Sequence, residues 1–396
     1  MLRAGVGLTH ERRGRTAAFE AASRAMARAG LTRAELCLCF ATPDHQPDMP
    51  SALAAIRQIT QAPQVVGCTG GGILTSEGEH EGQSALGVLV ASGDELRVRP
   101  FLVHTLEASE DAVAQAIARS LAAPGGDASE DGRPALLLAL VGALGSHPSR
   151  LLDRLATLLP DVPIMGGSAV GTPDGADVWA LGEVARGGAC GALISGVPRV
   201  AIGVAHGCHP VGPLLTVTRA RGNLIFELDE EPAFEAFARL CREPLLADLR
   251  RAAAFVFAGL HAGTGARADY RVRSFIGFDP QSGVLAISEA VEEGQKLTFL
   301  LREAQGARRD LEAMLGEVGE KLSGARPAFG LYVNCAGRGQ GLYGIADHDV
   351  AFIKRALGEF PLLGFSSAAE IAPLGGRPAL EMYTGVLAVF AEVAQA

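Results

Sequence analysis

Aromatic side chains and positive charge are both scarce in this sequence. Aromatic residues make up 5% of it, with one tryptophan, and 35 lysines and arginines stand against 44 aspartates and glutamates. A general nucleic-acid binder needs a basic surface, and a binder of single strands needs aromatic rings on which bases stack. The formal net charge of −9 and the few rings therefore argue against nucleic acid as a partner.

Long apolar runs are missing as well. The longest lies near residues 134–145, too short to cross a bilayer, and the N-terminal residues lack the apolar core of a secretory signal. The seven cysteines include no Cys-x-x-Cys pair, which argues against a structural zinc site or a disulfide framework. We therefore expect a cytoplasmic protein with no membrane partner.

Glycine, by contrast, is abundant, with 50 of the 396 residues against a usual share of about 7%. The glycines follow no three-residue period, so collagen is excluded and turns or close backbone approaches remain. The length suggests two or three globular domains. A polar segment rich in glycine and proline, residues 124–134, is predicted to be a linker or an exposed loop.

One order of elements recurs three times: strand, helix, strand, small-residue loop, returning strand. The three passages run over residues 36–91, 135–195 and 329–390. In each, a glycine opens a loop that carries a hydroxyl side chain; the pairs are Gly67 with Thr69, Gly166 with Ser168, and Gly364 with Ser366. This repetition predicts an α/β fold of two related domains, with mixed sheets built from repeated units.

Two local expectations accompany the repeat. Residues 16–29 are predicted to form a helix with Phe19, Ala22 and Met26 on one face and Gly30 as its stop. The strand-like runs 86–91 and 96–103 are joined by a short connection, which favours antiparallel pairing between them.

Several motifs together resemble a known family, the FIST proteins. The turn Gly67–Thr69 resembles the signature of the FIST N domain. The segments that resemble the FIST C domain are residues 217–229, 269–273, 293–295, 334–339, 364–373 and 383–384. The resemblance extends from about Glu35 to Phe390 and implies a FIST N-like domain at 1–215 and a FIST C-like domain at 216–396.

The sequence departs from the family pattern near both glycine turns. A Gly-Glu pair that the family carries after the first turn is replaced by Gly72-Ile73, and its C-terminal counterpart is Ala369-Glu370. The second change keeps the carboxylate and loses the glycine.

The resemblance implies an intracellular sensory protein that binds a small ligand, and amino acids are the suggested ligands. It also implies that the protein is not an enzyme. No output motif is left over, so signalling would pass through a separate partner such as a histidine kinase or a cyclase. No cofactor is expected. The alternative is a haem-based nitric-oxide sensor, since some relatives are similar to such proteins; the candidate haem ligands are His45, His104, His206, His209, His261 and His348.

Two pairs of charged residues suit a small ligand. Arg338, in a glycine-flanked loop after a strand, could bind a carboxylate or form a salt bridge that fixes the loop. Glu370 could accept from a ligand ammonium group or pair with Arg338, and the two together would suit a zwitterion. Arg271 and Arg273 share one face of a predicted strand and either line the site or face solvent.

Two cysteines beside the glycine loops, Cys68 and Cys335, are interpreted as small buried hydrophobes. The alternative is an enzyme that uses Cys335, Arg338 and Glu370, although no histidine stands out as a base. No Gly-Lys-Ser/Thr motif supports nucleotide binding. No metal ligand is expected, and the predicted ligand-binding residues are Gly67, Cys68, Thr69, Ser168, Arg271, Arg273, Asn334, Cys335, Arg338, Gly364, Ser366, Glu370 and Thr384.

Overall fold

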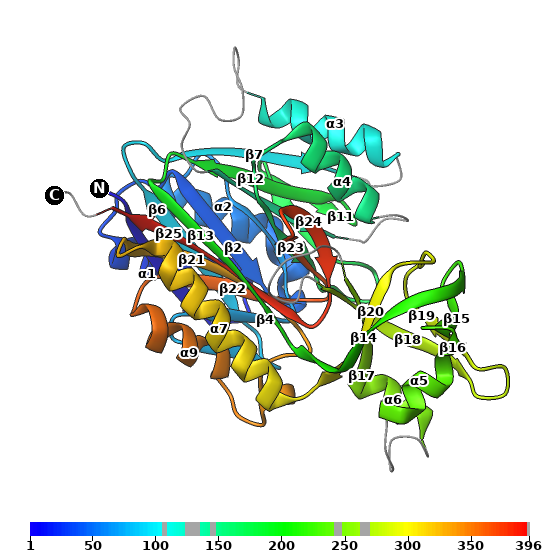
Figure 1. The fold of residues 1–396 in the computed structure, drawn as a ribbon. Helices are drawn as coiled ribbons and strands as arrows, with labels where there is room; N and C mark the ends of the chain where they lie inside the picture. Colours follow the sequence, from blue (N-terminus) through cyan, green and yellow to red (C-terminus); the bar gives the residue numbers. More distant parts are fainter. Residues whose placement is uncertain (105–108, 123–134, 143–147, 241–247, 262–269, 394–396) are drawn as a thin grey trace. The chain divides into compact units, whose positions relative to one another are not determined.

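A computed structural model describes residues 1–104, 109–122, 135–142, 148–240, 248–261 and 270–393 of the chain (Figure 1). The chain forms two compact units. Unit 1 comprises Met1–Ala205, Leu311–Leu380 and Thr384–Ala396, and unit 2 comprises His206–Asp310 and Glu381–Tyr383. The predicted linker at 124–134 lies outside the described residues, and the predicted domain boundary near residue 215 stays a prediction.

Three repeats of one element order make up unit 1. Repeat 1 contains β1 (Arg3–Thr9), α1 (Gly14–Ala29), β2 (Leu36–Ala41), η1 (Pro43–Asp48), α2 (Met49–Thr60), β3 (Val66–Thr69), β4 (Gly72–Thr75), β5 (Gly78–Glu81) and β6 (Leu86–Ser92). Repeat 2 contains β7 (Arg97–Val103), α3 (Glu110–Leu121), β8 (Ala135–Val141), α4 (Pro148–Leu158), β9 (Ile164–Ser168), β10 (Asp177–Ala180), β11 (Glu183–Arg186) and β12 (Ala189–Ser195).

Repeat 3 is interrupted by unit 2 after its first strand. It contains β13 (Arg199–His206), α7 (Ala304–Leu322), β21 (Arg326–Cys335), α8 (Gln340–Tyr343), α9 (His348–Leu357), β22 (Leu362–Ser367), β23 (Glu370–Leu374), β24 (Arg377–Glu381) and β25 (Thr384–Glu392). The predicted mixed α/β fold with repeated units is therefore confirmed.

Each repeat builds one six-stranded sheet, and the repeats exchange hairpins. The three strand orders are β1-β6-β2-β3-β10-β11, β7-β12-β8-β9-β23-β24 and β13-β25-β21-β22-β4-β5. Repeat 2 thus lends its hairpin β10–β11 to repeat 1, repeat 3 lends β23–β24 to repeat 2, and repeat 1 lends β4–β5 to repeat 3. This cyclic exchange ties the three repeats together, because no sheet is complete without strands from another repeat.

The strand order within the sheets also explains one wrong prediction. The expected antiparallel pairing of residues 86–91 with 96–103 does not occur. In its sheet β6 lies between β1 and β2, so both of its edges are occupied. The next strand, β7, instead pairs with β12 of repeat 2.

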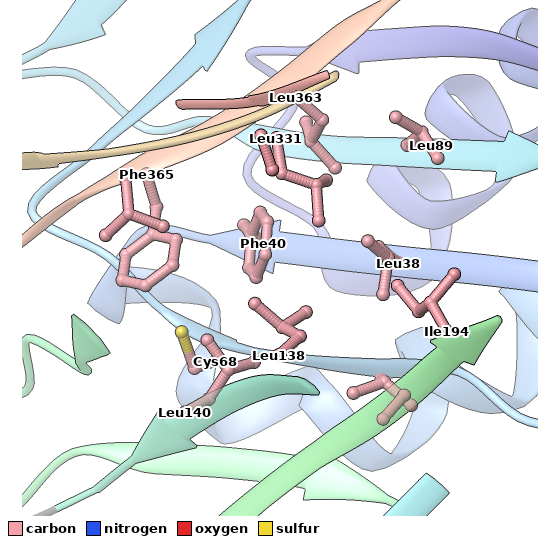
Figure 2. Close-up of a cluster of buried hydrophobic side chains, with 14 of the residues drawn as sticks. Leu38, Phe40, Cys68, Leu89, Leu138, Leu140, Ile194, Leu331, Leu363 and Phe365 are labelled. Carbon is pink, nitrogen blue, oxygen red and sulfur yellow. The ribbon is translucent and has the colours of Figure 1, made fainter. Parts of the chain in front are cut away.

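The inner faces of the three sheets pack on one common hydrophobic core. Figure 2 shows Phe40 of repeat 1, Leu138 of repeat 2 and Leu331 of repeat 3 converging in it. Helices cover the outer faces: α1 and α2 in repeat 1, α3 and α4 in repeat 2, and α7 and α9 in repeat 3 (Figure 1). This layering buries both faces of central strands such as β2 and β22, as expected for strands that read as continuous apolar runs.

Helix α1 packs through an alanine stripe, and Phe19 is not on it. The buried residues of the helix are mostly alanines, whereas Phe19 is 60% exposed. A Cβ built on Gly7 of β1 would lie 2.0 Å from the carbonyl oxygen of Ala21, so helix and strand approach too closely for a large side chain between them. The prediction that Phe19 shares the inward face with Ala22 and Met26 is therefore wrong, although Gly30 does end the helix in the left-handed conformation.

Unit 2 is a seven-stranded sheet with the order β14-β20-β17-β18-β19-β15-β16. A further pairing of β14 with β15 closes it into a barrel-like arrangement. Its core is aromatic, with Phe237 edge-on to both Phe275 and Phe299. The elements are β14 (Cys208–Arg221), β15 (Leu224–Leu228), β16 (Glu231–Pro232), α5 (Ala233–Leu240), α6 (Leu249–Phe255), β17 (Val256–His261), β18 (Tyr270–Asp279), β19 (Val284–Ile287) and β20 (Lys296–Arg302).

None of the helices among the described residues combines the length and the apolar character that crossing a membrane requires.

Candidate functional site

The three glycine loops of unit 1 meet in a ring of main-chain hydrogen bonds. Each loop donates one N–H group to the carbonyl oxygen of the hydroxyl residue in another loop. The bonds run from Val170 to Thr69 (3.0 Å), from Ala368 to Ser168 (3.4 Å) and from Gly71 to Ser366 (2.8 Å). The structure therefore brings Thr69, Ser168 and Ser366 together, although they are far apart in the sequence.

Two of the three hydroxyl groups hold exchanged hairpins in place. The Thr69 hydroxyl donates to the main-chain oxygen of Asp177 and accepts from its N–H, both at 3.3 Å. The Ser168 hydroxyl accepts from the N–H of Ala369 at 3.1 Å. In repeats 1 and 2 these side chains thus attach β10 and the start of β23 to their host sheets.

Two of the three turn glycines are required by close strand contacts. A Cβ on Gly67 would lie 1.6 Å from the Cys39 carbonyl oxygen, and one on Gly364 would lie 1.8 Å from that of Tyr332. A side chain at either position would therefore force adjacent strands apart. This contact explains both glycines without a ligand.

Repeat 3 differs from the others at the end of its second strand. Asn334 pairs with Ser366, at the position where Ala41 pairs with Thr69 in repeat 1 and Val141 with Ser168 in repeat 2. Asn334 is fully buried, and neither atom of its amide has a hydrogen-bond partner among the residues that the structure describes. Buried amides are normally satisfied, so this one needs an explanation.

The neighbourhood of Asn334 is polar and lies close to exposed residues. Paired residues of neighbouring strands share a face, so the Ser366 side chain lies beside that of Asn334. Both stand at the carboxyl ends of the parallel strands β21 and β22, where open α/β sheets bind their ligands. Ala336 and Ala368, two residues beyond each of them, are exposed.

Arg338 forms a buried ion pair. Its Nε donates to Asp349 Oδ2 at 2.9 Å and its Nη2 to the Tyr343 hydroxyl at 2.6 Å, while the Tyr332 hydroxyl donates to Asp349 Oδ2 at 2.7 Å. Burial alone would raise the pKa of Asp349, but the Arg338 guanidinium and these hydrogen bonds hold it well below its usual value. Arg338 therefore takes the loop-fixing role that was the alternative to ligand binding.

Glu370 has a different partner. Its Oε2 accepts hydrogen bonds from the N–H of Thr384 at 3.1 Å and from the Thr384 hydroxyl at 2.8 Å. The two members of the expected zwitterion clamp, Arg338 and Glu370, are thus each engaged by another residue. Thr384, also expected at the site, takes part only as the partner of Glu370.

Both singled-out cysteines are buried. Cys68 lies in the common core, where burial raises the pKa of its thiol well above the usual value. Cys335 is 8% exposed, and its sulfur accepts from the N–H of Gly337 at 3.4 Å. These surroundings match the interpretation as small hydrophobes, and we base no catalytic step on either thiol.

The candidate haem ligands contact other protein groups. His45 bonds the Ser84 hydroxyl, His104 and His209 pair with Glu183 and Glu303, His348 stacks on Tyr343, and His206 and His261 lie against Tyr270. Each of these rings therefore contacts a protein group, and none of the contacts marks one histidine as a haem ligand.

In unit 2, Arg271 and Arg273 lie on β18 and bind the same carboxylate. Arg271 Nη2 lies 2.7 Å from Glu289 Oε1, and Arg273 Nε contacts Glu289 Oε2. Arg273 is almost buried, whereas the side chains of Arg271 and Glu289 are 27% and 23% exposed. The two arginines therefore share a face, as predicted, at a place that solvent reaches.

Sequence reasoning missed Glu381 beside these arginines. Its Oε2 accepts from the N–H of Val272 at 3.4 Å, and the residue is fully buried. Desolvation raises its pKa to about 8, against the opposing effect of Arg273 and Arg271. The only sign of Glu381 in the sequence is its charge just before the Tyr383-Thr384 motif. Its contact with Val272 could not be predicted, because 109 positions separate the two residues.

Known proteins resemble this chain over nearly its whole length. The FIST N domain pattern matches residues 35–231 and the FIST C domain pattern matches residues 233–373. An uncharacterised protein of Mycobacterium bovis is 30% identical over 402 residues, covering 99% of both chains. An uncharacterised protein of Mycobacterium tuberculosis is 29% identical over 402 residues, covering 99% of this chain and 100% of its own.

Two solved structures align with most of the chain at low similarity. A cyanuric acid hydrolase from A. caulinodans aligns with a TM-score of 0.37 and 12% identity, covering 99% of this chain and 100% of its own. A chorismatase aligns with a TM-score of 0.31 and 10% identity, covering 91% of this chain and 94% of its own. We base no argument on similarity at this level.

Proposed function

Because this chain belongs to the FIST family, with a FIST N and a FIST C domain, we propose that it senses an amino acid or a similar small ligand. FIST domains are sensory domains that bind small ligands in signal transduction. The protein would act by binding and not by catalysis, and it would pass the signal to a separate protein such as a histidine kinase or a cyclase.

The observation that carries the choice of ligand is the Asn334 amide. A buried amide without partners costs about 1–3 kcal/mol, and a ligand that satisfies it recovers that free energy on binding. The amide offers a donor, Nδ2, and an acceptor, Oδ1. An amino acid supplies the matching pair, because its carboxylate accepts from Nδ2 and its ammonium group donates to Oδ1.

Ser366 supports the same ligand class. Its hydroxyl lies on the same face as Asn334 and is a second donor for a carboxylate. The exposed residues Ala336 and Ala368 give solvent access at this end of the strands. A ligand bound here would lie next to the hydrogen bonds that connect the three glycine loops. Its binding would therefore stabilise or weaken the contacts that join the three repeats.

Calorimetric titration of the full chain with the twenty amino acids tests the proposal. At least one should bind saturably, and Asn334→Leu should abolish that binding while leaving the protein folded, since Leu has similar size and no polar atom to satisfy. Asn223→Leu is the matched control, because Asn223 donates to Ile287 in unit 2. This control should keep full affinity.

Two results would overturn the proposal. One is unchanged affinity in Asn334→Leu, and the other is the absence of binding for every amino acid. A Soret band in the absorbance spectrum of the purified protein would favour the haem alternative instead. The signalling step needs its own assay, in which the ligand changes the activity of a purified kinase or cyclase only when this protein is present.

A further inference from the structure

One edge of β18 in unit 2 carries a polar cluster that the amino-acid proposal does not use. The main-chain N–H of Val272 points away from β17 and donates to Glu381 Oε2. Arg271 and Arg273, on either side of Val272, both bind Glu289. The cluster therefore consists of two arginines of β18 and two carboxylates, Glu289 and Glu381, that bind this part of the strand.

Two buried polar atoms of this cluster have no partner. In the described part of the chain, nothing hydrogen-bonds Glu381 Oε1 or Arg271 Nε. Both atoms are inaccessible to solvent, although the outer part of the Arg271 side chain is exposed. Buried polar atoms are normally satisfied, so these two atoms of one cluster need an explanation.

The charge of the cluster selects the kind of group. With its pKa raised to about 8, Glu381 is mostly protonated at neutral pH. Among these four side chains, the positive charges of the two arginines then stand against the single negative charge of Glu289. In this state Arg271 Nε and Glu381 Oε1 are both donors.

We propose that Arg271 Nε and Glu381 Oε1 bind the two oxygens of a small monocarboxylate. One oxygen accepts from the guanidinium, and the other accepts from the protonated Glu381 in a carboxylic acid–carboxylate hydrogen bond. The site lies in unit 2 and is independent of the amino-acid site proposed at Asn334. Either proposal can therefore fail without the other.

The pH dependence of binding distinguishes an anion from a cation at this site. An anion binds the protonated form of Glu381, so its affinity falls as Glu381 ionises. A ligand with an ammonium group would show the reverse, because it would bind the ionised form. Among the described residues, the charged groups that most affect the pKa of Glu381 are Arg273, Arg271 and Glu289.

The experiment is a calorimetric titration of the full chain with acetate, propionate and benzoate from pH 6.5 to 9.5 at constant ionic strength. At least one should bind saturably at pH 6.5, with an apparent Kd that rises about tenfold between pH 7 and pH 9. Inorganic phosphate is titrated in parallel. Tighter binding of phosphate than of every monocarboxylate would overturn the assignment.

Variants separate the donor role of Glu381 from its charge. Glu381→Gln keeps a donor at the same place and removes the titration, so binding should persist with a flat pH profile. Arg271→Met should weaken binding at least tenfold. Arg219→Met is the matched control, since Arg219 is an exposed arginine of unit 2 that pairs with Glu227, and its affinity should be unchanged.

Three results would overturn the proposal. They are no saturable binding of any of these monocarboxylates at pH 6.5, affinity that increases with pH, and a pH profile in Glu381→Gln that matches that of the original protein. Because Glu381→Gln is nearly isosteric, it also keeps the test usable if Arg271→Met fails to fold.

Discussion

Glu79 Oε1 accepts a 3.0 Å hydrogen bond from the main-chain N–H of Val350, which lies 271 residues further along the chain. Glu79 belongs to the hairpin that repeat 1 lends to repeat 3, and Val350 lies in the first turn of α9. The N–H groups of a first helical turn have no partner within the helix. The exchanged hairpin therefore caps a helix of the repeat that receives it.

The burial of Glu79 makes part of the stability depend on pH. Burial and the nearby Asp349 raise the pKa of Glu79 from 4.5 to about 7. The folded protein then binds a proton that the unfolded chain releases, so the free energy of unfolding falls as pH rises from about 5 to 7. The slope from this residue is at most about 1.4 kcal/mol per pH unit.

Urea unfolding of Glu79→Gln at pH 5, 6, 7 and 8 measures this contribution. Gln keeps an acceptor for Val350 and cannot ionise, so its stability should fall less steeply than that of the original protein between pH 5 and 7. Glu312→Gln, which removes an exposed carboxylate paired with Arg355, should keep the original profile. Identical profiles for Glu79→Gln and the original protein would contradict the prediction.

The ion pair of Arg338 with Asp349 predicts a strongly non-additive pair of substitutions. Arg338→Met leaves the buried Asp349 charge without its partner and should destabilise by about 3–5 kcal/mol. Arg338→Met with Asp349→Leu removes both charges, so the double variant should be more stable than Arg338→Met alone. The free energies of unfolding in urea decide this, and a loss below about 1 kcal/mol for Arg338→Met would contradict it.

The sequence predicted the strands of the repeat better than their partners. The strand-like runs 86–91 and 96–103 are β6 and β7. The exchanged hairpins escaped prediction because their strands are mostly four residues long and pair with residues far away in the chain. The same distance hid Glu381, whose contact with Val272 depends on the barrel of unit 2. The partner of Arg338, by contrast, lies only 11 positions away, at the start of α9.

Two glycines, one in a close strand contact and one with open space around it, test the role of the strand contacts. Gly364→Ala would place a Cβ 1.8 Å from a carbonyl oxygen of β21, so the strands must separate and we expect a loss of several kcal/mol or failure to fold. Gly316→Ala, in the interior of α7 with open space around it, should stabilise by about 0.5–1 kcal/mol. Thermal unfolding compares the two, and a tolerated Gly364→Ala would contradict the contact.

Trp179 reports on the hairpin exchange, because it is the only tryptophan and lies on β10, the strand that repeat 2 lends to repeat 1. It pairs with Gly67 of β3. Its side chain is fully buried in the hydrophobic cluster between the sheet of repeat 1 and the helices α1 and α2. If the exchange joins the repeats, its fluorescence should change in the same urea transition as the main loss of far-ultraviolet circular dichroism.

Thr69→Val sharpens this test, because it removes the hydroxyl that bonds the main chain of Asp177 at the start of β10. The lost contact lies in the exchanged hairpin, yet both signals should shift together to lower urea. A fluorescence change at clearly lower urea than the loss of circular dichroism would mean that the hairpin detaches by itself. In that case the repeats would be held together by the common core and not by the exchange.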